Sequence, residues 1–188
     1  MEKQKILFVS HCILNISSKV VMWDYEDMAA EEELRQRFLM KAIPRGIQLI
    51  QLPCPEFTLY GPRRWGHVSD QFDNVFFRNH CRKLLEPILD QCEEYLATPE
   101  RYEVLGFAGI DGSPSCGVDY TGSSRDYYGS LGGHPDPLSV YATGELVNRS
   151  GVMISVLRDM LAERGLDLPI KGLFAAEPEK ILSYISED

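Results

Sequence analysis

Three of the five cysteines in the chain stand at the ends of apolar runs. Cys12, Cys54 and Cys116 each follow a run that we interpret as a buried strand. The runs span residues 5–10, 46–52 and 102–109. In an open parallel sheet, ligands bind at the carboxyl edge, and adjacent strands lie about 4.8 Å apart. We therefore expect the three thiols to meet in one pocket at that edge.

Three thiolates in one pocket would repel one another and would be costly to desolvate, whereas a soft metal would neutralise them. Zinc with His11 as a fourth ligand is one possibility. An iron–sulfur cluster with three protein ligands is the more productive hypothesis, because one iron then stays open to substrate. The alternative is three unrelated reduced cysteines, since the long stretches between them form no local ligand motif.

Two further side chains are placed to take part in chemistry at this pocket. Glu56 lies two residues beyond Cys54, and prolines on both sides of Cys54 favour an extended turn that points the carboxylate towards the pocket as a proton donor or acceptor. Ser113 precedes Cys116 by three residues, so a tight turn brings its hydroxyl near whatever the sulfur binds. A solvated carboxylate and a purely structural serine are the alternatives.

Cys81 and Cys92 are expected to lie outside the site. Apolar residues recur at helical spacing across residues 74–96, and both cysteines share the apolar face of that predicted helix. Free cysteine is among the most buried residue types. We therefore interpret these two as small buried hydrophobic residues.

The remaining elements define a fold class. A fourth strand is predicted at residues 168–175, and the predicted helices cover residues 24–42, 74–96, a stretch that begins between 143 and 151 and ends at 164, and 177–186. Strands that alternate with helices predict a single-domain, doubly wound α/β fold of the Rossmann or flavodoxin-like kind, with helices on both faces of a mainly parallel sheet. We expect about four strands in the order 2-1-3-4.

Three stretches of the sequence show no sustained period of apolar residues. Residues 13–21 are predicted to be a loop, and residues 57–73 and 118–142 are predicted to be lid loops, because long loops in compact domains are usually functional. The single predicted domain spans residues 1–188.

Composition narrows the class of partner. The chain has 28 acidic and 19 basic residues and a formal net charge of -9, which argues against nucleic acid and favours a small molecule as the partner.

The sequence also indicates where the protein works. No apolar run approaches the roughly 20 residues that span a bilayer, and the N-terminus leads into a predicted strand rather than a signal peptide. We therefore expect no membrane partner and a cytoplasmic protein. An odd number of cysteines without a Cys-x-x-Cys pair points away from disulfides.

The motifs at the three predicted strand ends resemble those of the thiouracil desulfidase family. They are Cys12 after the first strand, Cys54-Pro-Glu56 after the second and Ser113-Pro-Ser-Cys-Gly117 after the third. The resemblance implies a [4Fe-4S] cluster held by Cys12, Cys54 and Cys116. In this family the fourth iron takes sulfur from a thiocarbonyl substrate while water replaces it.

The same resemblance implies roles for further residues. Glu56 and Ser113 match the catalytic carboxylate and hydroxyl of the family, and the neighbours His11, Asn15 and Ser115 are the expected substrate-binding residues. The chain departs from the family after Cys12 and at residues 57–64, so a divergent relative with changed specificity for a thiolated, nucleobase-like compound is expected.

Two other functional classes stay open. One is a zinc-stabilised or metal-free α/β module that binds a small ligand without chemistry. The other is a cysteine nucleophile at Cys116, for which His11 is the candidate base.

Overall fold

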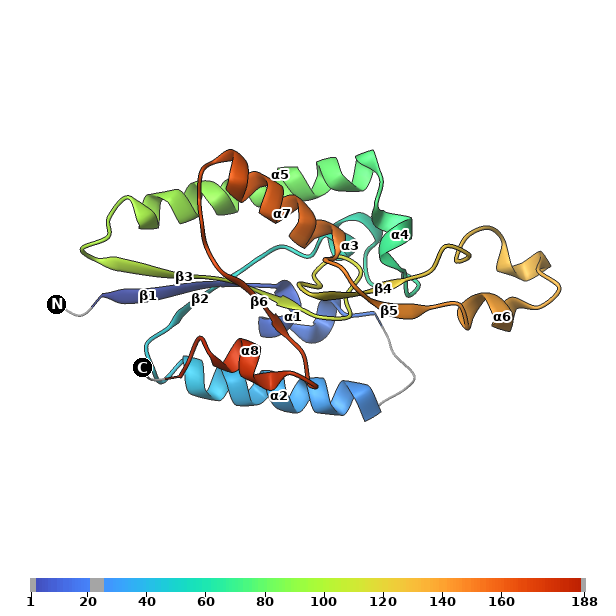
Figure 1. Cartoon of the computed structure of the whole chain (residues 1–188), viewed down its shortest axis with the longest axis horizontal. Coiled ribbons are helices and arrows are strands. Elements are labelled where there is room, and N and C mark those ends of the chain that lie inside the picture. Colours follow the sequence, from blue (N-terminus) through green and yellow to red (C-terminus); the bar gives the residue numbers. More distant parts are fainter. Residues whose placement is uncertain (1–2, 21–25, 187–188) are drawn as a thin grey trace.

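A four-stranded parallel sheet forms the centre of the computed structural model, which describes residues 3–20 and 26–186 (Figure 1). The strands are β1 (Gln4–Val9), β2 (Gln48–Gln51), β3 (Tyr102–Ile110) and β6 (Ile170–Leu173). Their order is β2-β1-β3-β6, and every neighbouring pair is parallel. The predicted α/β class, strand number and 2-1-3-4 order are therefore confirmed.

Helices cover both faces of this sheet. The helices α5 (Val75–Leu96) and α7 (Val152–Glu163) lie on one face, and α2 (Glu26–Ala42) and α8 (Pro178–Leu182) lie on the other (Figure 1). The predicted start of α2 at residue 24 lies outside the described residues. The predicted last helix, 177–186, is shorter in the structure and ends at Leu182.

The two helical layers explain why the strands carry uninterrupted apolar runs. In β1, Leu7 and Val9 belong to the core under α2 and α8, whereas Phe8 belongs to the core under α5 and α7. Phe8 stacks on Phe107 of β3 with their ring centroids 5.0 Å apart. A parallel sheet that is buried on both faces needs apolar residues at consecutive positions, which removes the two-residue alternation of a half-exposed strand.

Short helices replace two of the predicted loops. The stretch that includes residues 13–20 contains α1 (His11–Leu14) and the 3₁₀ helix η1 (Ile16–Ser18), while the last position of that predicted loop, residue 21, lies outside the described residues. Residues 57–73 overlap α3 (Pro55–Tyr60) and α4 (Ser69–Phe72). These predictions of irregular structure were wrong because helices this short show no periodic pattern of apolar residues.

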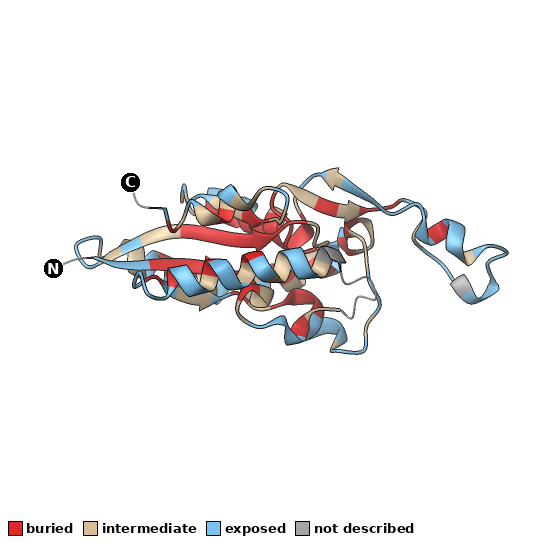
Figure 2. Ribbon diagram, turned by 90° about the horizontal axis from the view of Figure 1, so that it is seen from below, coloured by how far each residue is buried: buried red, intermediate tan, exposed pale blue. Residues whose placement is uncertain are grey.

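The predicted loop at residues 118–142 contains part of an antiparallel hairpin. Its strands are β4 (Tyr120–Ser123) and β5 (Glu145–Asn148), and the segment between them includes η2 (Leu131–Gly133) and α6 (Pro137–Tyr141). The extension carrying α6 projects from the body of the protein and is largely exposed (Figure 2). A four-residue strand containing glycine gives no strand signal in the sequence, so the hairpin was missed.

The helix α5 confirms the prediction for residues 74–96. It begins after Asn74, whose side chain accepts the backbone N–H groups of Phe76 and Phe77 as an N-cap. Cys81 and Cys92 are fully buried in the core between α5, α7 and the sheet, as predicted. Burial raises the pKa of Cys81 to about 12 and that of Cys92 to about 11, so both thiols are neutral at pH 7.

We expect Cys81→Ser and Cys92→Ser to lower the free energy of unfolding by about 1–3 kcal/mol each, because a buried hydroxyl without a partner loses its hydration. Urea unfolding at pH 7 measures this change. The matched substitutions Cys81→Ala and Cys92→Ala place no hydroxyl in the core and separate the polarity effect from the loss of volume. Serine variants as stable as the wild type would show that these positions reach water.

Candidate active site

The three strand-end cysteines lie at the carboxyl edge of the sheet. Cys12 is in α1, directly after β1; Cys54 caps α3, which follows β2; and Cys116 lies in the loop after β3. Cys54 and Cys116 are buried, Cys12 is half-buried, and all three are free thiols. Burial is the main cause that raises the pKa of Cys116, and the charges of Cys54 and Cys12 raise it further. The three sulfurs therefore share one electrostatic environment.

The backbone at Cys54 sets the positions of two site residues. Cys54 itself is extended, with φ -84° and ψ 114°, and its Sγ accepts the backbone N–H of Phe57 at 3.4 Å. Pro55 occupies the first turn of α3, where a missing N–H costs no hydrogen bond, so the chain enters a helix at once. The predicted extended turn is thus correct for Cys54 and wrong for Glu56, which lies in the first helical turn.

The side chain of Cys12 contacts η1. Its Sγ lies 3.4 Å from the hydroxyl oxygen of Ser18, which is buried. Burial raises the pKa of Cys12, and the hydrogen bond from Ser18 opposes that shift. Ser18 was not identified from the sequence, because the contact depends on the turn that η1 makes.

The loop that carries Cys116 is organised by Asp111. One carboxylate oxygen of Asp111, Oδ1, accepts the backbone N–H groups of Val118 at 2.7 Å, Asp119 at 2.8 Å and Tyr120 at 3.1 Å. The other oxygen, Oδ2, is buried and has no hydrogen-bond partner among the described residues. A Cβ at Gly172 of β6 would overlap this carboxylate, so the neighbouring strand needs glycine there.

The same loop rests on the beginning of α7. The backbone N–H of Val152 donates to the carbonyl of Pro114 at 3.0 Å, and that of Met153 donates to the carbonyl of Ser115 at 2.9 Å. A Cβ at Gly151, which precedes α7, would lie 2.7 Å from the backbone of Ser115. The helix therefore begins at Val152 because its first N–H groups bind the cysteine loop.

Glu56 is the centre of a buried polar network beside the thiols. Ser115 donates its hydroxyl to Oε1 of Glu56 at 2.6 Å, and Arg64 donates Nε–H to Oε2 at 3.3 Å. The Ser115 hydroxyl oxygen also lies 3.5 Å from Sγ of Cys116. A carboxylate beside these thiols contributes to the raised pKa of Cys12, Cys54 and Cys116.

Arg64 is a residue of this site that the sequence did not reveal. Its side chain is only 4% exposed, and its Nη2 donates to the carbonyl of Ser18 at 2.5 Å. Arg64 thus joins the Glu56 carboxylate to the segment that packs on Cys12. The role of Arg64 depends on the fold of the loop that carries it and on its contact with Ser18, which is distant in the sequence. Neither the loop nor the contact has a sequence signature.

The other predicted residues occupy different positions. Ser113 uses its hydroxyl oxygen to accept the backbone N–H of Cys116 at 3.0 Å. His11 places Nδ1 2.6 Å from Nε2 of Gln51, and partial burial lowers its pKa. Asn15 is exposed and accepts the N–H of Ser17 as the cap of η1. Of the three predicted substrate contacts, only Ser115 joins the Glu56 network, and a substrate role for His11 and Asn15 stays a prediction.

The type and spacing of the donor side chains determine whether a single metal ion or a cluster could bind at this site. Within residues 3–20 and 26–186, no three His, Cys, Asp or Glu side chains are arranged to hold a single metal ion. Zinc would need its donors within about 2.0–2.3 Å of one point. An iron–sulfur cluster binds each thiolate at a different iron, so its sulfur ligands stand further apart than those of a single ion. Thiolates are the donors that iron–sulfur clusters use, and the charges of these three thiols interact.

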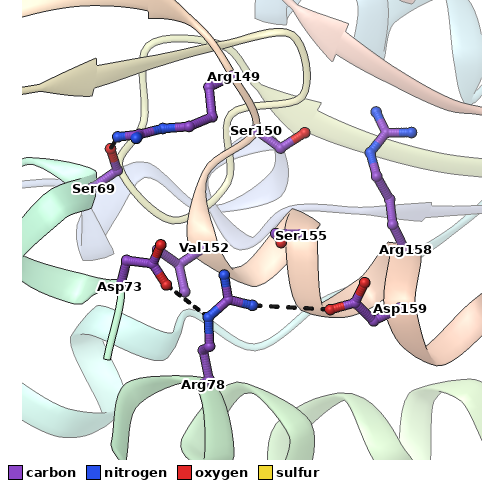
Figure 3. A pocket seen from close by; sticks show the side chains of 9 residues that line it. All are labelled: Ser69, Asp73, Arg78, Arg149, Ser150, Val152, Ser155, Arg158 and Asp159. Atoms are coloured by element: carbon purple, nitrogen blue, oxygen red, sulfur yellow. Dashed lines mark hydrogen bonds and ion pairs between the residues drawn. The ribbon is translucent and has the colours of Figure 1, made fainter. Parts of the chain in front are cut away.

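A hollow at the start of α7 has a different character from the thiol site. It encloses about 270 Å³ and is lined by charged and hydroxyl side chains and by Val152 (Figure 3). Arg78 pairs with Asp73 at 2.7 Å and with Asp159 at 3.9 Å, and Arg149 donates to Ser69 at 2.7 Å. No thiol lines this polar pocket. Its paired charges fasten the segment around α4 to α7 and β5.

The fold and the site together define a Rossmann-like α/β protein with a three-thiol edge. Residues 4–131, more than half of the chain, match the family described as "Putative 2-thiouracil desulfurase". The chain is also 33% identical, over 118 residues, to "Uncharacterized protein MJ0003" of Methanocaldococcus jannaschii, which covers 63% of this chain and 70% of that protein. No solved structure gives a significant match. The chain therefore belongs to the 2-thiouracil desulfurase family.

We expect Asp111→Ala to lower the free energy of unfolding by about 3 kcal/mol or more, because hydrogen bonds to charged groups contribute roughly 1.5–3 kcal/mol each. Asp111→Asn keeps an acceptor at Oδ1 and is expected to lose less. Urea unfolding of the metal-free chain at pH 7 measures both. The typical net value of one hydrogen bond is roughly 1 kcal/mol. If the free energies of unfolding of Asp111→Ala and the wild type differ by less than that, the carboxylate does not organise the cysteine loop.

Proposed function

We propose that the protein is a desulfidase that converts the C=S group of a small, thiolated, nucleobase-like compound into C=O. The observation that carries this proposal is the buried Glu56 carboxylate, which Ser115 and Arg64 hold beside three converging thiols. Family membership supports the reaction class. The net charge of -9 supports a neutral substrate rather than a nucleic acid.

Cys12, Cys54 and Cys116 are the residues that would hold a [4Fe-4S] cluster. When bound, the cluster would supply an iron atom that is open to the sulfur of the substrate. Burial of Cys54 and Cys116 keeps the thiols neutral in its absence, so loading requires that their protons leave. Ser18 and the N–H of Phe57 are placed to stabilise the resulting thiolates at Cys12 and Cys54.

The overall reaction fixes what the side chains must do. The oxygen of water becomes the carbonyl oxygen, the C=S bond breaks, and both protons of water leave with the sulfur as hydrogen sulfide, so no net oxidation occurs. Glu56 is the group that would accept a proton from the attacking water, because its carboxylate is buried next to the thiols. Arg64 would balance its negative charge and keep it fixed in place.

The two serines have separate proposed tasks. Ser115 orients Glu56 through their 2.6 Å hydrogen bond and therefore acts as a positioning residue. Ser113 is the proposed catalytic hydroxyl. Its oxygen accepts the N–H of Cys116 at 3.0 Å and lies 3.5 Å from the Ser115 hydroxyl oxygen, and its own O–H is the group that would orient the substrate. Because Glu56 and Ser115 are buried, the hydrogen bond between them is electrostatically stronger than it would be in water.

We place this activity in the cytoplasm, where the five free cysteines stay reduced. None of the helices in the described ranges is long and apolar enough to cross a membrane.

We expect the cluster-loaded protein to release sulfide and the oxo product in equal amounts from 2-thiouracil or a related thio-heterocycle under anaerobic conditions. Glu56→Gln should keep the iron and sulfide content and lower kcat by about 10²–10⁴-fold, the usual share of general acid–base catalysis. Glu33→Gln, an exposed glutamate on α2, is the matched control. Loaded protein that binds thio-heterocycles without releasing sulfide would favour a binding module.

The serine variants test the division of tasks. Ser115→Ala acts through Glu56, so it should slow the wild type and add little to Glu56→Gln, whereas Ser113→Ala should slow both backgrounds. Turnover of Glu56→Gln at the wild-type rate would remove the carboxylate from the mechanism.

A further inference from the structure

Ser10 carries a buried hydroxyl that the proposed mechanism does not use. Its side chain is 1% exposed, and its Oγ has no hydrogen-bond partner among the described residues. Ser10 occupies the N-cap position of α1, where a serine usually bonds to the first turn, yet its side chain makes no such bond. A buried hydroxyl without a partner is unfavourable, so the fold alone gains nothing from it.

The register of the sheet fixes where Ser10 lies. Val9, the residue before it, pairs with both β2 and β3. The backbone N–H of Ser10 donates to the carbonyl of Ala108 at 2.8 Å, and that of Leu52 donates to the carbonyl of Val9 at 2.7 Å. These bonds continue both pairings by one step. Ser10 therefore lies in the last row of the sheet, between Leu52 and Gly109, with about 4.8 Å to each neighbouring strand.

The alternation of side chains along β1 gives the face on which Ser10 lies. Phe8, two residues earlier, belongs to the core under α5 and α7, as do Leu52 and Cys116. Side chains two residues apart on a strand share a face, so Ser10 is on the face that carries Cys116. A Cβ at Gly109 would lie 2.3 Å from the carbonyl oxygen of Cys116. The Cys116 loop thus packs directly on the strand position next to Ser10.

The groups around Ser10 differ between its two sides. Towards the centre of the sheet, the rings of Phe8 and Phe107 stack on each other within the same core and offer no acceptor in their side chains. Towards the carboxyl edge, Cys12 and Cys54 each follow the row of Ser10 by two residues. The thiols therefore stand one step beyond the row that contains the unpartnered hydroxyl.

We infer that Ser10 is a further residue of the cluster-binding site, and that its hydroxyl donates a hydrogen bond to sulfur when the cluster is bound. This inference rests on the cluster-dependent function proposed above. Thiolate and sulfide sulfur atoms are negatively charged acceptors, whereas a thiol is a weak one. Hydrogen bonds to sulfur also help to set the reduction potential of an iron–sulfur cluster. Ser10 then acts on the cluster rather than on the substrate.

The metal-free chain tests whether the hydroxyl is unpartnered. Ser10→Ala removes a group that has no bond to lose, so its urea midpoint at pH 7 should equal or exceed that of the wild type. Ser69→Ala is the matched control. Ser69 is also 1% exposed, but it donates to the carbonyl of Gly122 at 2.9 Å and accepts from Arg149 at 2.7 Å, so its loss should lower the midpoint. An equal fall in Ser10→Ala would overturn the inference.

The cluster-loaded protein tests the bond to sulfur. Ser10→Ala should shift the reduction potential of the cluster to a more negative value, because one donor to negatively charged sulfur is lost. It should also lose its iron to a competing chelator at about one tenth of the concentration that the wild type needs, since removing a hydrogen-bond partner from a metal site costs roughly tenfold or more in affinity. Ser69→Ala should change neither quantity.

Neither measurement uses a thiolated substrate, so the inference and the desulfidase function can fail separately. A negative shift in Ser10→Ala would support the role of Ser10 even in protein that releases no sulfide, and only the desulfidase function would then fail. Sulfide release by a Ser10→Ala protein with wild-type potential and chelator resistance would overturn the role of Ser10 and leave the desulfidase function standing. A wild-type chain that takes up no cluster would overturn this role as well.

Discussion

The placement of two buried thiols and one half-buried thiol beside a carboxylate is the constraint on which the rest of the structure depends. Desolvation and the neighbouring negative charges disfavour every thiolate at this edge, most strongly at Cys116. This arrangement is stable only while the thiols keep their protons, or while a bound cationic group takes the place of those protons. Arg64 supplies one compensating charge at Glu56, and the N–H groups of α7 and the Asp111 carboxylate hold the Cys116 loop in place.

The parts of this arrangement that follow from local pattern were predictable. Four apolar runs separated by helical periods gave the sheet and its order, and the position of each cysteine after a run placed it at the correct edge. Glu56 was placed on the wrong kind of backbone, because Pro55 starts a helix as readily as it ends one. Arg64 and Ser18 were missed because their importance comes from contacts between distant segments.

The residues that carry the proposed chemistry lie in the part of the chain that the family match covers. That match spans residues 4–131 and therefore includes all three strand-end cysteines, Glu56 and Arg64. It ends within the extension that carries α6, so α7, whose first N–H groups bind the Cys116 loop, lies beyond it. The position of the cysteine loop therefore also depends on a segment outside the match.

Cluster loading of cysteine variants tests the assignment of the three thiols most directly. After anaerobic reconstitution, iron, acid-labile sulfide and visible absorption are measured for each purified chain. The wild type and Cys81→Ser should take up a full [4Fe-4S] complement, whereas Cys12→Ser, Cys54→Ser and Cys116→Ser should each lose it. Full loading of Cys54→Ser, or equal loss in Cys81→Ser, would contradict the assignment.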